Sequence, residues 1–465
     1  MSNPLSDIFQ TLKLRLTSAS PLQKKMLGGG MWATIGKASL SASGLVLNIV
    51  LARLISPEEI GAYFIAISII SMGGVIVLVG LNQTIVRLIA ESIANRHPGR
   101  ARQAISHSFI ILSISSFFGV CFLMLGGGEW LTDTIFNLPS TSNFNFLLAL
   151  WALLYIVQTL LAEIFRGFQD IRLASSFGGG GAITRIILVI ILTGVWFYFG
   201  YSNFEQIILM TIVSYLITTF LAGFLVHEHL KMIPLGNGSI SFAEVINITI
   251  PLWISSVSLA FMNQIDVWFL GAYYSVGEVA VYGVVLRLAL ISSTPGLIIN
   301  AIMPPIISEL YTIGEKNQLE RTLRSISTLL FLIASVVFLI FLFFGKSILL
   351  LLFGEYYVDG YTALIILTIG QLINISIGAA GLTLIMSGFQ STFMKITLLS
   401  GLLSLGLLYF FTPLYSFLGV AIAIAIAKIF QSIIVLIFTH KKTGLWTHVK
   451  PILLLHPKSL WRSMR

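Results

Sequence analysis

The sequence predicts an all-α polytopic membrane protein with about twelve transmembrane helices in two parallel repeats, each a bundle of six. Three observations lead to this fold class. Of the 465 residues, 57% are hydrophobic and only 10% are charged, whereas about a quarter of the residues in a soluble domain are charged. Apolar stretches of about 20 residues, long enough to cross a hydrocarbon core as helix, recur along the chain. Two loops about half a chain apart also have nearly the same sequence.

Twelve apolar stretches follow one another along almost the whole chain. Their predicted ranges are 32–53, 60–80, 105–125, 144–165, 177–198, 205–226, 245–269, 276–299, 325–344, 361–386, 396–411 and 416–438. They divide the chain into a leader at 1–30, a first six-helix lobe at 31–230, a linker at 231–243, a second lobe at 244–438 and a basic tail at 439–465. The leader is basic and only patchily apolar, so we do not expect it to be a cleaved signal peptide.

Two pairs of similar segments indicate the internal repeat. IFRGFQDIRL at 164–173 follows the fourth predicted helix, and IMSGFQSTFM at 385–394 follows the tenth. SPEEIGAY at 56–63 precedes the second helix, and SVGEVAVY at 275–282 precedes the eighth, so the two pairs have nearly the same offset. Because six helices separate the members of each pair, both copies enter the membrane from the same side. The repeats are therefore expected to be parallel, related by an axis along the membrane normal.

The two GFQ loops are candidate hinges or gates. Gly167 and Gly388 are expected to permit tight turns, and Gln169 or Gln390 to bond the last exposed helix carbonyls. Short connectors retained since duplication are the alternative interpretation.

The distribution of positive charge predicts the orientation in the membrane. With the N-terminus inside, 21 Lys and Arg residues fall in the cytoplasmic loops and termini, against only Arg53 and Lys346 on the opposite side. Lys and Arg beside helix ends are retained on the cytoplasmic side, so both termini are expected there. The formal net charge of +9 is then explained by orientation and by contact with anionic lipid, and no nucleic-acid partner is required.

Five charged side chains fall inside the apolar stretches: Lys37, Arg185, Asp266, Arg287 and Lys428. A charge at the centre of a membrane helix costs about 2.5–3.5 kcal/mol, so such residues usually face water, protein or a ligand. Snorkelling to the interface is the alternative for Lys37 and Arg185, and a structural pair is the alternative for Asp266 with Arg287. The excess of cations predicts a site for an anion such as phosphate or pyrophosphate.

Polar and small residues form stripes on four predicted helices. The stripes comprise Thr34, Lys37, Ser41, Gly44 and Asn48 on the first helix; Tyr155, Gln158, Ala162 and Arg166 on the fourth; Ser256, Asn263 and Asp266 on the seventh; and Gln371, Asn374, Gly378 and Gly381 on the tenth. Spacings of three and four place each set on one helix face, which is expected to look into a cavity between the lobes. The alternative is ordinary helix packing through small and polar residues.

Metal and enzyme chemistry find little support. Cys121 is the only cysteine, so disulfides within the chain and sites with several thiolates are excluded. His227 and His229 lie at a predicted helix end without a third ligand in sequence. The glycine runs lack the Lys-Ser/Thr ending of a phosphate loop. We therefore expect no cofactor, no metal and no enzymatic activity.

The hairpin and the first GFQ loop resemble a known family. LARLISPEEIGAYFIAISIISM at 51–72 resembles the hairpin between the first two helices of polysaccharide biosynthesis proteins, with Ala-Arg-Leu, then Ser-Pro-Glu, then a glycine and an aromatic residue. RGFQDIR at 166–172 is similar to the Arg-Gly or Gln-Gly turn of that family. Over nearly its whole length, the chain looks like the O-antigen and exopolysaccharide flippases (the Wzx group) of the MOP superfamily.

This resemblance implies a MATE-like, V-shaped pair of six-helix bundles in the bacterial plasma (inner) membrane. The implied function is to flip an undecaprenyl-pyrophosphate-linked oligosaccharide, a repeat unit of O-antigen, capsule or exopolysaccharide, to the outer leaflet through a cationic cavity. Membrane lipids, a polysaccharide polymerase and a chain-length regulator are the expected partners. Candidate substrate-binding residues are Lys37, Asn48, Arg185, Asn263, Asp266, Arg287, Gln371, Asn374 and Lys428.

Other functions stay open on the sequence alone. A cation-coupled multidrug exporter of the same superfamily requires an acidic residue within a lobe. The first lobe has none at mid-membrane, whereas Asp266 keeps ion coupling open in the second. Lipid II flippases generally carry two further helices. A membrane scaffold of a polysaccharide assembly complex predicts that neutralising the cations has no effect.

Overall fold

The computed structural model describes residues 42–95, 97–136, 144–178, 183–198, 204–232, 239–294 and 296–450. All regular elements in these ranges are helices. Eight of them are long and apolar enough to cross a membrane by length and composition, and Ala42–Leu54 and Ile183–Val195 are shorter apolar helices. The predicted leader and the predicted stripe residues Thr34, Lys37 and Ser41 lie outside the described residues.

Seven α-helices follow Ala42–Leu54 in the first half of the described chain. They are α3 (Pro57–Val77), α4 (Leu81–Ala94), α5 (Pro98–Phe122), α6 (Phe144–Gly167), α7 (Ile171–Ser176), α8 (Ile183–Tyr198) and α9 (Phe204–Met232), with two short π-helical segments at Leu123–Gly127 and Trp130–Ile135. The second predicted stretch thus corresponds to α3, and α4 is a further helix that begins directly after the stretch ends. The break falls at Gly80, whose φ of 79° lies in the left-handed region that glycine enters without strain.

The second half of the described chain contains another seven α-helices. They are α10 (Phe242–Tyr273), α11 (Val276–Ile291), α12 (Gly296–Thr312), α13 (Lys316–Leu352), α14 (Tyr361–Ile377), α15 (Ala380–Met386) and α16 (Gln390–Thr443), with a short 3₁₀ helix at Glu355–Gly360. The eighth and tenth predicted stretches are each divided between two helices. The last two stretches are joined in α16 across a kink at Ser416, where φ is 53°.

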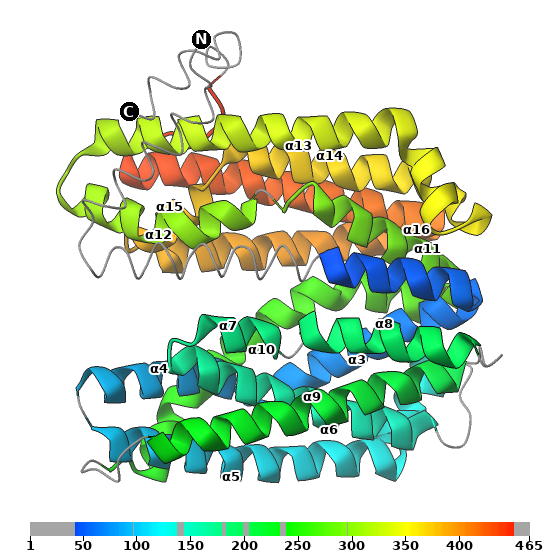
Figure 1. Cartoon of the computed structure of the whole chain (residues 1–465). Coiled ribbons are helices and arrows are strands. Elements are labelled where there is room, and N and C mark those ends of the chain that lie inside the picture. The colour runs from blue at the N-terminus through cyan, green and yellow to red at the C-terminus, as the bar shows by residue number, and fades with distance from the viewer. Residues whose placement is uncertain are drawn as a thin grey trace, which may run out of the picture.

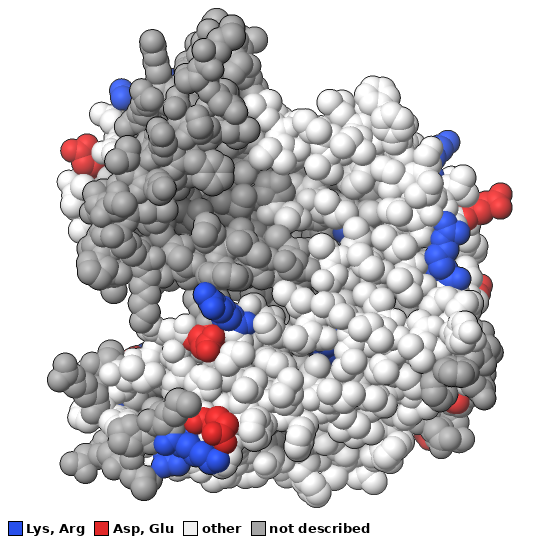
Figure 2. Space-filling model, in the orientation of Figure 1, with Lys and Arg blue, Asp and Glu red and all other residues white. Residues whose placement is uncertain are grey.

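The helices form two groups (Figure 1). Helices α4 to α9 lie in one group and α11 to α16 in the other, while α3 and α10 run between them. On the face drawn in Figure 2, most charged side chains lie toward the two ends of the molecule, and the described surface between the ends is largely white. Such a surface is expected where helices contact hydrocarbon.

Helices α3 and α11 begin in the same way, about half a chain apart. Ser56 Oγ accepts from the Glu59 N–H at 3.2 Å, and Ser275 Oγ accepts from the Glu278 N–H at 3.4 Å. Each serine is therefore an N-cap that satisfies one backbone donor of the first helical turn. The weaker of the two sequence echoes thus corresponds to one structural feature that occurs in both halves of the chain.

The GFQ loops repeat with a shift in alignment. Both end their helix in a Schellman motif, but the residue with positive φ is Gln169 (63°) in the first loop and Gly388 (87°) in the second. In the first loop the N–H of Asp170 donates to Phe165 O at 3.0 Å, and in the second the N–H of Phe389 donates to Leu384 O at 2.8 Å. Gln169 is therefore equivalent to Gly388, and not to the glutamine of the second loop. This alignment gives the turns the same offset as the two N-cap serines.

The prediction that glycine permits the turn is confirmed for Gly388 and wrong for Gly167. Gly167 is the last residue of α6, and a Cβ there would lie 2.9 Å from Ile89 Cβ on α4. Close packing is the physical reason for glycine at that position. In the described part of the chain, neither Gln169 nor Gln390 bonds a helix carbonyl through its side chain, so the proposed glutamine caps are not formed.

Substitutions at these two turns should change the free energy of unfolding in opposite directions. Gly388→Ala is expected to lower the free energy of unfolding by about 1 kcal/mol, because an L-residue is strained at this φ. Gln169→Gly is expected to raise it by up to about 1 kcal/mol, because the same strain is relieved. Thermal unfolding in detergent measures both changes, and a loss of stability in the Gln169 variant would contradict the shifted alignment.

Among the described residues, the two groups of helices share a buried apolar cluster at one end and have separate clusters at the other. One buried cluster contains side chains of both halves, among them Tyr63, Val279 and Leu364. Toward the GFQ loops the buried clusters separate, one around Ile89 and others around Leu323 and Leu384. At the joined end, the Arg53 guanidinium donates to the carbonyl oxygens of residues 350, 351 and 352, which terminate α13. The halves therefore converge where α3 and α11 begin.

The first half of α10 packs on the first group of helices, although it follows the predicted linker. The Arg100 guanidinium pairs with Glu244 at 2.7 Å, and the Trp253 indole N–H donates to Ile76 O at 3.0 Å. Further along α10, the Trp268 indole N–H donates to Ser68 Oγ at 3.0 Å, so α10 contacts the first half of the chain along much of its length.

Candidate functional site

A buried guanidinium lies inside the first group of helices. Arg185 on α8 is 6% exposed, and its Cζ lies 4.2 Å from the centroid of the Tyr215 ring. A cavity of about 50 Å³ beside it is lined by Leu47, Tyr63, Ile67, Ile70, Ser71, Trp151, Tyr155, Arg185, Val189, Thr211 and Tyr215. The faces of aromatic rings attract a cation through their quadrupole. The rings therefore help to hold the Arg185 charge within the bundle.

This position changes the interpretation of Arg185 and of the stripe on α6. Arg185 does not snorkel to an interface, and a cavity of about 50 Å³ has room for a few water molecules, not for a pyrophosphate with its sugars. Tyr155 lines the same cavity, and the buried Gln158 amide donates to Thr218 Oγ1 on α9 at 3.1 Å. Both α6 side chains thus face the interior of the bundle, where they pack between helices.

Asp266 and Arg287 lie where the two groups meet. The Asp266 carboxylate accepts from the Tyr282 hydroxyl at 2.7 Å and from the Val267 N–H at 2.8 Å. The Arg287 guanidinium donates to Gly283 O at 2.9 Å, and its Cζ lies 3.6 Å from the centroid of the Phe64 ring. None of the ion pairs among the described residues joins Asp266 to Arg287. The two charges are near one another, but each has its own partners.

Two adjacent aromatic residues of α3 connect these charged groups. Tyr63 lines the cavity beside Arg185, whereas Phe64 lies under Arg287 of α11. A Cβ on Gly283 would overlap the Phe64 ring, so this crossing requires glycine. Neither Tyr63 nor Phe64 was predicted as a site residue from the sequence. A signal was present, because Tyr63 ends the segment SPEEIGAY and Tyr282 ends the similar segment SVGEVAVY.

Loss of the Tyr282 hydroxyl is expected to destabilise this junction. Tyr282→Phe should lower the free energy of unfolding by about 1–3 kcal/mol, because the buried Asp266 carboxylate loses a donor. Thermal unfolding in detergent measures the change. The matched control is Tyr409→Phe, since that side chain is 77% exposed, and equal melting temperatures for the two variants would contradict the assignment.

A third group of polar residues lies in the second group of helices. Lys428 on α16 is half-buried and makes no hydrogen bond or ion pair with any described residue. One turn later, the Ser432 hydroxyl donates to Asn374 Oδ1 on α14 at 2.9 Å. One turn before Lys428, Ala425 packs on Gly370, which adjoins Gln371. Lys428, Gln371 and Asn374 therefore occupy the same level of two adjacent helices.

The remaining predicted site residues have mixed positions. The Asn48 amide donates to Gly44 O at 2.7 Å within its own helix, and Asn263 has an exposed side chain. Ser256 accepts from the Gln83 amide of α4 at 3.2 Å. Lys37 lies outside the described residues. Apart from Asn48 and Asn263, the described substrate-binding candidates thus form three separate groups, around Arg185, around Arg287 and around Lys428.

Comparisons with known proteins agree with this architecture. A family model described as polysaccharide biosynthesis protein matches residues 27–311. The capsular polysaccharide biosynthesis protein CapF of Staphylococcus aureus is 24% identical over 400 residues, which cover 82% of this chain and 91% of that protein. The Shigella flexneri protein named "Putative O-antigen transporter" is 24% identical over 400 residues, covering 83% and 90%.

A solved structure has the same fold. An inward-facing multidrug resistance MATE family transporter of the MOP superfamily matches with a TM-score of 0.70 at 17% identity, covering 87% of this chain and 94% of that one. At this identity the likeness concerns the arrangement of helices alone.

Proposed function

Since the chain belongs to the polysaccharide biosynthesis protein family and is a multi-pass membrane transporter with a MATE-like fold, we propose that it flips an undecaprenyl-pyrophosphate-linked oligosaccharide from the cytoplasmic to the outer leaflet. The oligosaccharide would be a repeat unit of O-antigen, capsule or exopolysaccharide. The name of the Shigella flexneri relative and the excess of membrane-embedded cations both support this substrate class.

The proposed architecture has twelve membrane spans in two six-helix lobes, with both termini on the cytoplasmic side of a bacterial inner membrane. The N-caps of α3 and α11 and the Schellman turns after α6 and α15 repeat at one common offset, which supports two copies of one unit. The concentration of Lys and Arg near the GFQ loops supports the orientation. The buried clusters separate toward that same side, as a cavity open to the cytoplasm requires.

Lys428 is the observation that carries the proposal. This residue is half-buried in a helix of high hydropathy, and no described residue pairs with it. Keeping a charge at this depth costs about 2.5–3.5 kcal/mol, so a role that compensates the cost is expected. A pyrophosphate supplies negative charge and several acceptor oxygens, which is the chemistry that lysine and arginine bind best.

The mechanism is alternating access between two lobes. Lys428 and the N–H groups of Arg287 other than the one bonded to Gly283 hold the pyrophosphate near mid-membrane, and Lys37 meets it earlier at the cytoplasmic side. Gln371 and Asn374 contact sugar hydroxyls, while the polyprenyl tail stays in lipid. The lobes then rock about the end where α3 crosses α11. Arg185, enclosed among aromatic rings, keeps the first lobe rigid during this motion.

Multidrug export is the less favoured function, because it requires an acid that is free to bind a cation. Both oxygens of the Asp266 carboxylate already accept hydrogen bonds, from Tyr282 and from Val267. These two bonds and the burial of the side chain favour a structural role for Asp266 at the junction of the lobes.

A reconstitution experiment tests the proposed substrate. Vesicles containing the protein are loaded on one leaflet with a fluorescent, undecaprenyl-pyrophosphate-linked oligosaccharide, and its appearance in the other leaflet is measured. Transfer faster than in protein-free vesicles is expected. Efflux of a cationic dye is measured in parallel. Dye efflux without transfer of the glycan would support the exporter, and neither activity would support a scaffold that serves a polymerase or a chain-length regulator.

A further inference from the structure

The segment that follows α16 covers the point where α14 ends inside the second group of helices. Helix α14 stops at Ile377 because Gly378 adopts a φ of 73°. The Val449 N–H donates to Ser376 O at 2.8 Å, and the Thr447 hydroxyl donates to Ile377 O at 2.7 Å. The last carbonyls of α14 would otherwise be unsatisfied. Residues 444–450, here called the C-terminal segment, are therefore part of the folded second lobe.

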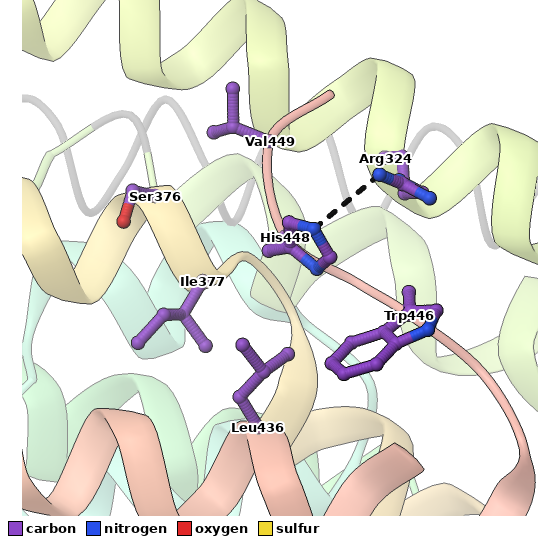
Figure 3. Close-up of a pocket in the computed structure, with 7 residues that line it drawn as sticks. All are labelled: Arg324, Ser376, Ile377, Leu436, Trp446, His448 and Val449. Carbon is purple, nitrogen blue, oxygen red and sulfur yellow. Dashed lines mark hydrogen bonds between the residues drawn. The ribbon is translucent and has the colours of Figure 1, made fainter. Parts of the chain in front are cut away.

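A cavity of about 690 Å³ lies between the C-terminal segment, α13 and the end of α14 (Figure 3). It is lined by Arg324, Ser376, Ile377, Leu436, Trp446, His448 and Val449. In Figure 3 the His448 ring lies between Arg324 and Trp446. This cavity is distinct from the groups around Arg287 and Lys428, and the proposed transport mechanism does not use it.

Two residues that line this cavity carry buried ring or guanidinium nitrogens without a partner among the described residues. The Arg324 guanidinium donates to Glu320 Oε1 at 3.2 Å and to His448 Nε2 at 3.4 Å, and its Nε–H is buried without a partner. Because arginine has no acceptor, His448 Nε2 must accept that bond. A neutral ring then carries its proton on Nδ1, which is also buried without a partner. Burial and the Arg324 charge lower the pKa of His448, which favours the neutral ring.

The surroundings of these donors favour an anion. The carboxylate of Glu320 is already bonded, since it accepts from Arg324 and from the Trp446 N–H at 3.1 Å. Exposed Lys441 and Lys442 shortly precede the C-terminal segment, and exposed Lys450 is its last residue. Two N–H donors beside a guanidinium charge suit an acceptor group with several oxygens.

We propose that this cavity binds a phosphate group, with the Nε–H of Arg324 and the Nδ1–H of His448 donating to its oxygens. The volume far exceeds that of one phosphate, so Trp446, Ile377 and Leu436 remain to contact the rest of a larger molecule. The phosphate comes either from the headgroup of an anionic lipid or from a soluble compound. The site does not depend on which solute the protein moves.

Binding to the purified full-length protein tests this proposal in two arms. In neutral detergent, inorganic phosphate is titrated and followed by calorimetry. In phosphatidylcholine nanodiscs containing phosphatidylglycerol, retained phosphatidylglycerol is counted by native mass spectrometry. Arg324→Gln is expected to weaken binding by about tenfold to a hundredfold, because a hydrogen bond to a charged group is lost. Arg321→Gln removes the same charge one turn earlier on an exposed face of α13 and is expected to change binding less than about twofold.

A second variant keeps the test decisive if Arg324→Gln lowers the melting temperature. His448→Gln retains an acceptor near the position of Nε2 but removes the Nδ1 donor, and it is expected to weaken binding by about tenfold. Binding of the lipid alone identifies a headgroup site, and binding of phosphate identifies a site for soluble ligands. If the wild type binds neither, or if Arg321→Gln weakens binding as much as Arg324→Gln, the proposal is wrong.

Discussion

Replacement of Lys428 by glutamine is expected to slow transfer of a lipid-linked oligosaccharide by about tenfold to a hundredfold in reconstituted vesicles. The reason is the loss of a charge-assisted hydrogen bond to the pyrophosphate, which contributes about 1.5–3 kcal/mol. Stability should not fall, because Lys428 makes no hydrogen bond or ion pair with the described residues. Removing its desolvated charge should instead leave the melting temperature equal or higher.

Two further variants make this expectation specific. Lys395→Gln removes the same charge from an exposed position near the start of α16 and should leave the rate within about twofold. Lys428→Arg keeps the charge and should retain much of the activity. A wild-type rate in Lys428→Gln would exclude this residue from the substrate site, and equal losses in both glutamine variants would indicate a general effect of charge.

Substitution of Gly61 by valine is expected to have the largest structural effect, at about 3 kcal/mol of lost stability or more. A Cβ at this position would overlap the backbone carbonyl of Val276, where α3 crosses α11. Overpacking a well-packed interior typically costs about 1–3 kcal/mol, and here the obstacle is backbone that cannot rotate away. Because the proposed lobes rock about this crossing, transfer of the glycan should also be lost.

The control for this substitution lies on the same helix. Gly73→Ala places a Cβ where no other atom lies within 4 Å, so its melting temperature should stay the same or rise by the helix propensity of alanine. Thermal unfolding and the transfer assay are measured for both variants. A stable, active Gly61→Val protein would contradict the close approach of α3 and α11 at this crossing.

Much of the fold followed from local patterns. Apolar stretches predicted the helices because a backbone in hydrocarbon must satisfy its own hydrogen bonds. Breaks inside a predicted stretch were missed, since a change of direction such as that at Gly378 does not interrupt the hydrophobic pattern. The similarity of the GFQ loops located two equivalent turns but misaligned them, because the amino-acid sequence of a turn does not show which residue has positive φ.

The candidate site was predictable in composition and not in geometry. Hydropathy alone identified Arg185, Arg287 and Lys428 as charges inside apolar stretches, each of which needs polar or aromatic neighbours to offset the cost of leaving water. Whether that environment is an aromatic cage, a ring on a neighbouring helix or an open position depends on which helices pack together. Tyr63 and Phe64 are adjacent in sequence, yet Tyr63 lines the cavity beside Arg185 and Phe64 contacts Arg287, because neighbouring positions on a helix point about 100° apart.

By itself, the sequence determined that this protein is a helical membrane protein, which segments form its helices and which charges are embedded among them. These properties depend on the free energy of transferring each segment from water to lipid, and that energy is nearly additive along a chain. Only the tertiary structure decided that Arg185 is enclosed, that Asp266 and Arg287 have separate partners and that the C-terminal segment completes α14. Those outcomes depend on contacts between helices distant in sequence, where packing and hydrogen bonding outweigh any local preference.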